Sequence, residues 1–305
     1  MKYMTITAAG IKWGISYQMV RKYLLQDRIP WAIRLNGHWK IPESCEKPIS
    51  LRVEKFIEQD SEVQFVRRLH YEMRRNIRHG IYEYLQVNAA YSSNRMAGNR
   101  LERKLVEQIF ESHKIINAFA QVSVEDLIET ENHFAAVKMI LKTVRQPLTI
   151  DYVKELHYEL TAGTIRSRSQ GWEPGEFRTE APKRYGEKAA EPEKISQALN
   201  LLIKSYEQKP TGPTAILNFH VKFEEIRPFD DFNGRVGRVI LLKECLRHRV
   251  TPFIIGNEQG TAYNRGIAEW KDDPAILRTV VTKAQDRFLD QLELLKHNEK
   301  LKQNM

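Results

Sequence analysis

Apolar residues recur at helical spacing along most of the chain from residue 48 onward. Within residues 213–226, Ile216, Phe219 and Phe223 stand three or four positions apart, and Pro213 precedes them. This period of about 3.6 residues predicts a helix that begins at the proline and buries one face. Similar patterns predict helices over 51–90, 101–145, 193–208, 234–248 and 274–297, and a loop over 163–192. No βαβ alternation occurs, so an all-α fold is predicted and a Rossmann-type fold is excluded.

The first 48 residues follow another pattern and predict a separate small module. Thr7 is expected to cap a helix over residues 8–13, and Gly14 to end it. Ser16 is expected to cap a second helix from Tyr17 to about Gln26. Two short helices joined by a tight turn form a helix-turn-helix.

A hairpin is predicted directly after these helices. Asn36-Gly37 separates two short apolar runs, and Asn-Gly is the strongest short signal for a hairpin turn. Helix, turn, helix and hairpin is the order of a winged helix-turn-helix, and the stretch resembles the MerR/excisionase kind. Eight Lys/Arg against three Asp/Glu in residues 1–50 give +5 of the chain's net +9, which favours DNA binding. The expected DNA-facing residues are Tyr17, Gln18, Arg21 and Lys22 on the second helix, with Arg34 and His38 on the wing. A module used only for protein contacts is the alternative.

Composition narrows the class of protein. A chain of 305 residues can form one large and one small domain, and 42% apolar with 29% charged residues is typical of globular proteins. Cys45 and Cys245 offer neither a disulfide framework nor metal-ligand spacing, which suits a reducing compartment. No apolar run of membrane-spanning length and no signal-peptide pattern occur. A cytoplasmic protein without a membrane contact is therefore expected.

An acidic Asn-Gly-Arg loop separates the two helices predicted at 213–226 and 234–248. Pro228 ends the first helix, because the residue before a proline is driven out of the helical region. The second begins near Asn233-Gly234, where free backbone N–H groups make an anion site. Taken alone, this feature also fits a plain structural helix start.

Three charged residues of the loop strengthen the prediction of a phosphate site. Arg235 and Arg238 are three positions apart, so both are expected to lean over the same side of the helix start. Asp231 precedes them and suits Mg²⁺, which prefers one carboxylate together with phosphate oxygens and water. The loop is therefore predicted to bind a nucleotide phosphate with a metal ion.

The whole string RPFDDFNGRVGR, residues 227–238, resembles the signature of the Fic family. That signature reads His-Pro-Phe, a variable residue, an acid, Gly-Asn-Gly-Arg, two further residues and a final Arg. The resemblance covers most of residues 85–295, through YSSNRMAGNRLE, WEPGEFR, LLKECLRHRVTPFII and YNRGIAEW. It implies an all-α Fic-type domain with a small β-hairpin flap, here preceded by the winged helix-turn-helix. It also implies a nucleotidyltransferase that moves AMP from ATP to a Ser, Thr or Tyr hydroxyl of a protein, the chain itself included.

The resemblance assigns roles to individual residues. Asp231 would bind Mg²⁺, and Phe229 would be a buried anchor. The positions implied for ATP are Phe232, Asn233, Gly234, Arg235 and Arg238 at the phosphates and Tyr263 at the adenine side. Core packing is an equal alternative for Tyr263. Those implied for a target-docking flap are Glu176, Phe177 and Arg178.

Arg227 departs from the family pattern, because it occupies the position of the motif histidine, which acts as general base. A guanidinium with a pKa above about 12 accepts no proton near neutrality. It can still stabilise phosphate, so nucleotide binding is expected to persist while catalysis falls by roughly 10²–10⁴-fold. His220, seven residues upstream, is expected to be a packed core residue rather than a replacement base.

A second departure lies in a motif that inhibits many Fic relatives, Ser-x-x-x-Glu-Gly/Asn. Ser93 and Gly98 fit this motif, but Ala97 stands in place of the glutamate. Alanine cannot pair with Arg238, so the usual autoinhibition is expected to be absent. Phe232 in place of the loop glycine is a smaller departure, whose bulk restricts the loop.

These residues leave three functions open: a weak or disarmed protein adenylyltransferase, a non-catalytic ATP-binding regulator that binds DNA, and a structural or dimerisation role. The predicted boundaries are 1–48 for the winged helix-turn-helix, 49–84 for a helical linker, 85–297 for the Fic domain and 298–305 for a polar tail. The protein target, the DNA operator and homo-oligomer formation are not determined by the sequence.

Overall fold

The computed structural model describes residues 3–25, 29, 32–35, 38–45, 62–113, 122–181, 189–208 and 212–303. The predicted turn at Asn36-Gly37 and the side chain of Arg34 lie outside the described residues. Within the described ranges, no helix combines the length and the apolar character needed to cross a membrane.

The N-terminal module has its own strands, helices and core. It contains β1 (Tyr3–Met4), α1 (Ile6–Trp13), α2 (Tyr17–Leu25), β2 (Ile33–Leu35) and β3 (His38–Pro42). The strands pair antiparallel in the order β1-β3-β2. Trp13, Val20 and Ile41 are buried in a small core between the helices and the sheet. The elements occur where the sequence predicts them, while DNA binding stays a prediction.

Capping residues set the ends of the two N-terminal helices. Thr5, not Thr7, caps α1, because its hydroxyl accepts the N–H of Ala8 at 3.2 Å. Gly14 ends α1 with a φ of 64°, and Ser16 accepts the N–H of Met19 at 3.2 Å, as the sequence predicts. The four residues expected on the exposed face of α2, namely Tyr17, Gln18, Arg21 and Lys22, are all exposed.

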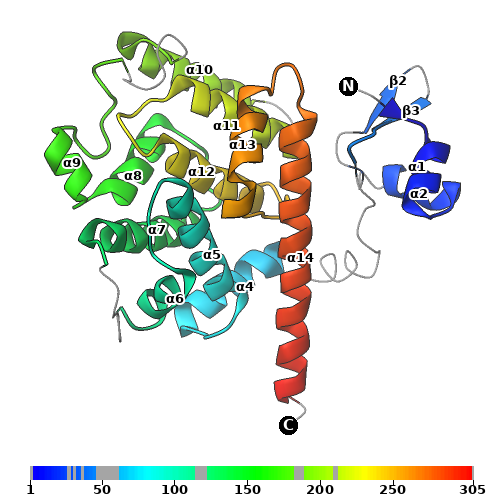
Figure 1. The fold of residues 1–305 in the computed structure, drawn as a ribbon, viewed down its shortest axis with the longest axis horizontal. Helices are drawn as coiled ribbons and strands as arrows, with labels where there is room; N and C mark the ends of the chain where they lie inside the picture. Colours follow the sequence, from blue (N-terminus) through cyan, green and yellow to red (C-terminus); the bar gives the residue numbers. More distant parts are fainter. Residues whose placement is uncertain are drawn as a thin grey trace.

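The rest of the described chain is a helical body (Figure 1). Its α-helices are α4 (Glu62–Arg75), α5 (Ile81–Met96), α6 (Arg103–Ser112), α7 (Val124–Lys142), α8 (Ile150–Thr161), α9 (Ile165–Gln170), α10 (Ile195–Glu207), α11 (Pro213–Ile226), α12 (Asn233–Arg247), α13 (Gly260–Ala268) and α14 (Ala275–Gln303), with short 3₁₀ turns η2 (Pro192–Lys194) and η3 (Asn257–Gln259). Helix α12 is central, since it packs against α11, α7, α8 and α5. Helix α14 runs along one side of the group.

The apolar periodicity correctly predicts which faces of α11 and α12 are buried. Ile216, Phe219 and Phe223 on α11 are at most 4% exposed, as are Val236 and Val239 on α12. One large core joins these helices to α4, α5, α7, α8, α10, α13 and α14. The start of α12 is therefore held by the whole helical body.

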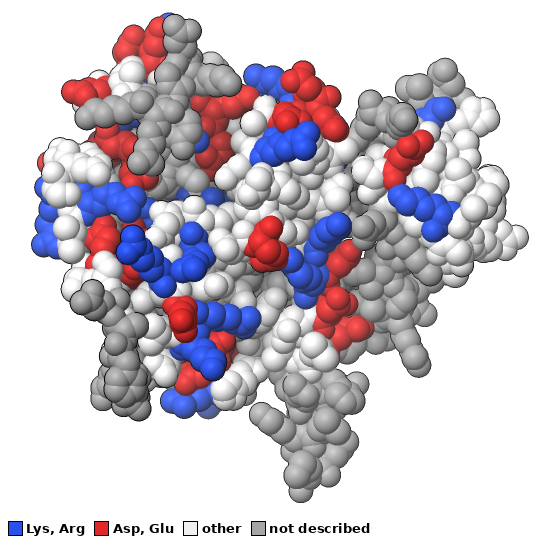
Figure 2. Space-filling view, viewed as in Figure 1, with Lys and Arg blue, Asp and Glu red and all other residues white. Residues whose placement is uncertain are grey.

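Three helices bear on the predicted extents of the elements. Helix α4 lies within the predicted helical linker, and its Leu69 is fully buried in the main core. Helix α14 continues to Gln303, into the predicted polar tail. Helix α9 occupies part of the predicted loop. On the face in Figure 2, basic and acidic side chains alternate over the helical body, so this face carries no single basic surface.

Candidate functional site

The turn from α11 to α12 holds two non-glycine residues in the left-handed conformation. Arg227 ends α11 with a φ of 49°, and Phe232 precedes α12 with a φ of 63°. Packing fixes the turn between them, because Phe229 is fully buried and stacks on His157 at 3.8 Å between ring centroids. Asn233 closes the turn by donating to the Phe229 carbonyl at 2.8 Å and accepting the Phe229 N–H at 2.9 Å. The prediction of Phe229 as a buried anchor is confirmed.

The N-terminus of α12 offers backbone donors. The first hydrogen bond at the start of this helix runs from the N–H of Val236 to the carbonyl of Phe232 at 2.9 Å. None of the residues that the structure describes accepts the backbone N–H of Asn233, Gly234 or Arg235. A Cβ at Gly234 would lie 3.0 Å from Nη1 of Arg238, so glycine keeps this end open. The arrangement can bind an anion.

Arg235 and Arg238 point to different neighbours. Arg235 is 2% exposed and forms an ion pair with Glu129 of α7, at 2.8 Å, with the Phe232 ring centroid 3.2 Å from its guanidinium carbon. Burial lowers the pKa of Arg235, and the charge of Glu129 opposes that effect. Arg238 instead donates to the hydroxyl and the carbonyl of Ser93 on α5, each at 3.0 Å. The two arginines therefore have different partners, and Nη1 of Arg238 stays 3.0 Å from the ideal Cβ of Gly234 at the start of the helix.

The positions of the inhibitory motif lie at the end of α5. Ala97 caps this helix, and Gly98 follows with a φ of 100°. Ala97 supplies no carboxylate, but Arg238 is still held, by the neutral oxygens of Ser93. The hydrogen bonds of Arg238 to α5 are thus to uncharged oxygens.

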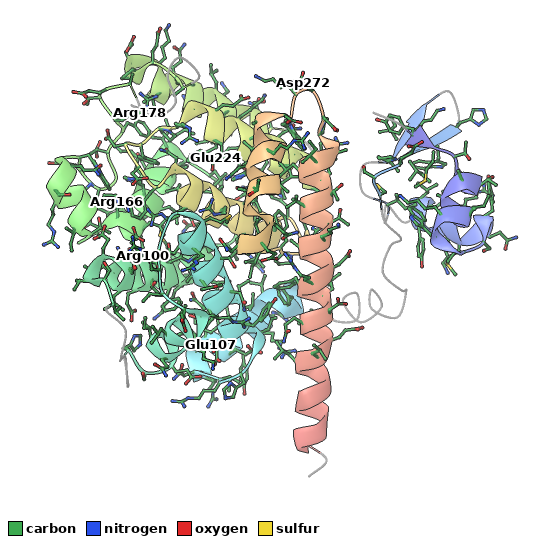
Figure 3. All side chains as sticks on the ribbon, viewed as in Figure 1. Arg100, Glu107, Arg166, Arg178, Glu224 and Asp272 are labelled. Carbon is green, nitrogen blue, oxygen red and sulfur yellow. The ribbon has the colours of Figure 1, made fainter. Side chains whose placement is uncertain are left out.

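Asp231, the predicted metal ligand, is engaged by Arg166 of α9 (Figure 3). Nη1 of Arg166 lies 2.7 Å from Oδ2 of Asp231, and Oδ1 accepts the N–H of Phe232 at 2.7 Å. Burial would raise the pKa of Asp231, but the hydrogen bond from Arg166 and the charge of Arg235 hold it below its ordinary value. Both carboxylate oxygens thus already accept a hydrogen bond, and in this arrangement the Arg166 guanidinium opposes a Mg²⁺ on Oδ2. The sequence pattern gave no signal for Arg166.

Glu224 lies beside the residue in the histidine position. Its Oε2 is 4.0 Å from Nη2 of Arg227, and it is only 8% exposed (Figure 3). Its Oε1 has no hydrogen-bond partner among the described residues and lies 3.0 Å from an ideal Cβ on Gly237. Burial raises the pKa of Glu224, while the charges of Arg238 and Arg227 lower it. Its spacing of three residues from Arg227 on one helix is the signal that could have indicated it.

His220 and Tyr263 face each other inside the core. Each is 1% exposed, and Nε2 of His220 forms a hydrogen bond with the Tyr263 hydroxyl. Burial lowers the pKa of His220 to about 3, so its ring is neutral. The prediction of a packed histidine is confirmed. The burial of Tyr263 favours core packing over contact with an adenine ring.

The loop after α9 carries the three predicted docking residues. Its described residues, 171–181, contain no strand, and residues 182–188, over which the predicted flap would continue, lie outside the described residues. Glu176 is exposed and pairs with Lys154 at 2.6 Å, while the Phe177 ring packs 5.7 Å from that of Phe229. The same loop sets the Trp172 ring 6.2 Å from that of Phe232.

Arg178, the third predicted docking residue, has a structural position. Its side chain is 2% exposed and donates to the carbonyls of Arg227 and Glu180, each at 2.8 Å, and to that of Ala190. Its backbone N–H donates to the Pro228 carbonyl at 3.0 Å. Arg178 therefore secures the turn that carries Arg227, and its guanidinium is not presented to a target.

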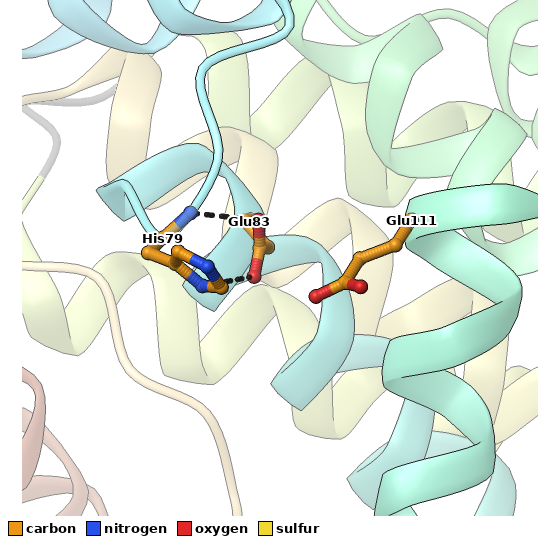
Figure 4. Close-up of side chains that lie close together, drawn as sticks. All are labelled: His79, Glu83 and Glu111. Carbon is orange, nitrogen blue, oxygen red and sulfur yellow. Dashed lines mark hydrogen bonds and ion pairs between the residues drawn. The ribbon is translucent and has the colours of Figure 1, made fainter.

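A separate group of acidic residues and a histidine lies at the start of α5 (Figure 4). His79, Glu83 and Glu111 place one ligand-type atom each within 4.8 Å of one another. Glu83 accepts the backbone N–H of His79 at 2.8 Å, and its other oxygen is 3.5 Å from Nδ1 of that ring. These two bonds hold His79 against the first turn of α5, whose N-cap, Gly80, has no side-chain cap hydrogen bond.

Comparisons with known proteins agree with the geometry of the turn. Residues 147–245 match the sequence model of the Fic/DOC family. The structure is similar to a Fic domain-containing signalling protein from Bacteroides thetaiotaomicron, with a TM-score of 0.59 and 18% identity over 75% of this chain and 95% of that one. It is also similar to Fic-1 (residues 134–508) from C. elegans, with a TM-score of 0.58 and 20% identity over 80% of this chain and 73% of that one. A third similar structure is a Fic family protein from Desulfovibrio desulfuricans, with a TM-score of 0.55 and 18% identity over 83% of this chain and 76% of that one.

A search of curated proteins found no match. At the identities above, the structural similarity shows the fold alone. Residues 147–245 thus match the Fic/DOC family model, and the helical body has an all-helical Fic-type fold. Proteins of this family generally bind a nucleotide together with a metal ion.

Proposed function

We propose that the helical domain binds the polyphosphate of ATP at the N-terminus of α12 and transfers AMP to protein hydroxyls weakly or not at all. One observation carries the proposal: Glu224 lies beside the start of α12, with Oε1 3.6 Å from an ideal Cβ on Gly234 and Oε2 4.0 Å from Nη2 of Arg227, the residue in the base position of the signature. A guanidinium stabilises phosphate and accepts no proton at neutral pH. Binding is therefore retained and proton removal is lost.

Residual transfer would need another proton acceptor. His220 is neutral but 1% exposed, and its Nε2 is bonded to Tyr263, so an incoming hydroxyl does not reach it. Glu224 is a carboxylate beside Arg227 with a pKa raised by burial, which suits proton transfer nearer neutrality. Glu224 is thus the residue that we assign to any residual transfer.

The second part of the proposal is that the N-terminal module binds DNA. With a net charge of +5 on residues 1–50 and an exposed α2, it suits binding to duplex DNA. A chain that binds ATP without consuming it can act as a cytoplasmic regulator whose DNA binding depends on nucleotide. A protein hydroxyl, on a partner or on the chain itself, remains the acceptor for residual AMP transfer.

The test compares the native chain with Arg227→His. Each is incubated with α-labelled ATP and Mg²⁺, AMP on protein is counted, and ATP binding is measured by calorimetry. We expect both to bind ATP, and Arg227→His to label protein roughly 10²-fold faster or more, because general-base help has that size. Adding Glu224→Gln to the native chain should abolish any residual label.

Arg103→Gln is the matched control, since it removes one arginine from the exposed pair with Glu107 on α6. It should bind and label like the native chain. Efficient labelling by the native chain would contradict the disarmed site. Absence of ATP binding in both forms would remove nucleotide binding altogether.

A further inference from the structure

We propose that Arg166 takes the place of a divalent cation at Asp231, so that a nucleoside polyphosphate binds to this chain without Mg²⁺. The inference rests on the nucleotide binding proposed above and names the group that replaces the metal ion. The sequence predicts that Asp231 binds a metal ion, whereas in the structure Asp231 is paired with Arg166.

The backbone of Arg166 is fixed in place. Thr164 caps α9 by accepting the N–H of Ser167 at 3.3 Å. Glu125, from the first turn of α7, accepts the N–H of Arg166 at 3.1 Å with one carboxylate oxygen and that of Ile165 with the other. Contacts within α9 and with α7 therefore fix the backbone of Arg166. From there its side chain reaches Asp231, in the turn between α11 and α12.

Two arginines and two carboxylates alternate behind the loop. Arg235 pairs with Glu129 at 2.8 Å, Nη2 of Arg166 lies 3.9 Å from the same Glu129 oxygen, and Nη1 pairs with Asp231 at 2.7 Å. The four charges sum to zero, so the negative charge of the ionised Asp231 is balanced within this group. In this network Asp231 orients a guanidinium instead of binding a metal ion.

Arg166 is also able to contact phosphate. Its side chain is 35% exposed, whereas that of Arg235 is only 2% exposed. A guanidinium has five N–H donors, and the pair with Asp231 uses one of them. Figure 2 shows basic side chains gathered over α9, where Arg166 begins. Its planar donor fork matches phosphate oxygens.

Mg²⁺ fits poorly beside this pair. It needs near-octahedral oxygen ligands at about 2.0–2.1 Å and retains several waters. A Mg²⁺ on Oδ2 of Asp231 would stand directly against the Arg166 guanidinium, which is 2.7 Å from that oxygen. Arg166 would have to leave before the metal ion could bind.

The test is calorimetry of the full chain with ATP, first with EDTA and then with excess Mg²⁺. For the native chain we expect affinities that agree within about threefold, since the required charge is already in the protein. Arg166→Gln keeps amide donors but loses the charge. In EDTA this variant should bind ATP roughly tenfold more weakly than the native chain, because one charge-assisted hydrogen bond contributes about that much to the affinity. Excess Mg²⁺ should restore its affinity for ATP.

Arg168→Gln is the matched control, because Arg168 lies on the same helix and donates to the carbonyls of Gly163 and Thr164. It should bind ATP like the native chain in both buffers. Native binding that requires Mg²⁺ would overturn the inference and leave the proposed function intact, and so would Arg166→Gln binding equally well in both buffers. No ATP binding in either buffer would overturn both.

Discussion

Phe232 holds a backbone conformation that glycine adopts without strain, with a φ of 63°. Left-handed φ costs a residue with a Cβ about 1–2 kcal/mol. The ring is 2% exposed and lies under the Arg235 guanidinium, and burial of a phenylalanine contributes about 3–5 kcal/mol when measured by truncation. Burial therefore outweighs the strain at this residue.

Phe232→Gly should lower the free energy of unfolding by roughly 2 kcal/mol, the difference between the lost ring and the relieved strain. Urea unfolding of the full chain measures it. Phe232→Ala, which loses the ring and keeps the strain, should be less stable than Phe232→Gly by about 1 kcal/mol. A glycine variant more stable than the native chain would show that strain dominates.

Glu224→Gln tests the buried carboxyl group beside Arg227. Burial raises the pKa of Glu224 above its ordinary 4.5, so the folded state holds the proton more tightly than the unfolded state. That stabilisation is complete below pH 4.5 and is lost as the pH rises through the folded pKa. At pH 7 the variant should therefore be more stable by on the order of 1 kcal/mol, and the gain should vanish near pH 4.

Thermal unfolding between pH 4 and 8 measures this dependence. Glu225→Gln is the control, because Glu225 is the next residue and is partly exposed in a pair with Lys271 at 3.1 Å. It should show little change in unfolding temperature across the range. If Glu224→Gln stabilised the protein equally at pH 4 and at pH 8, ionisation of Glu224 would be excluded as the cause.

At the scale of elements, the sequence predicted the helices and helix ends whose signals lie within the segment itself. The period of Ile216, Phe219 and Phe223 and the proline at 228 predicted α11 and its end, and Gly14 predicted the end of α1. Helix α9 was missed because it has only six residues in a stretch rich in Ser, Gly and Arg. The partners of Arg238, Arg235 and Asp231 were missed because they come from α5, α7 and α9, and spacing within one helix carries no signal for them.

The exposed face of α2 predicts a salt-dependent DNA contact. Arg21→Ala and Lys22→Ala should each weaken binding to duplex DNA and lower the slope of log affinity against log salt by about 1, the value for one phosphate contact. Fluorescence anisotropy with labelled DNA measures both. Arg67→Ala, an exposed arginine on α4, should have no effect. Unchanged binding in the two α2 variants would favour a module for protein contacts.

The whole helical body is needed to form the site at α12. Ser93 on α5 holds Arg238, Glu129 on α7 holds Arg235, and the Gln146 carbonyl accepts the buried Lys243 ammonium at 2.6 Å. All three partners precede residues 147–245, the stretch that matches the family model. The match therefore marks the signature and does not delimit a folding unit.

A fragment of residues 147–245 should not unfold cooperatively, because it leaves Arg235 without its buried partner and omits α5, α7 and α14 from the core. A fragment of residues 62–303 retains these contacts and should show one sharp transition. Circular dichroism during heating compares the two. A cooperative transition in the shorter fragment would contradict the dependence on Glu129.

The contact between Trp172 and Phe232 has a practical consequence. The indole is partly exposed and its ring lies 6.2 Å from the residue whose backbone starts α12. Indole emission responds to the polarity and charge around it, so we expect an anion at this turn to change the emission of Trp172. Trp172 thus provides a label-free signal of occupancy once the emission of the other four tryptophans is subtracted.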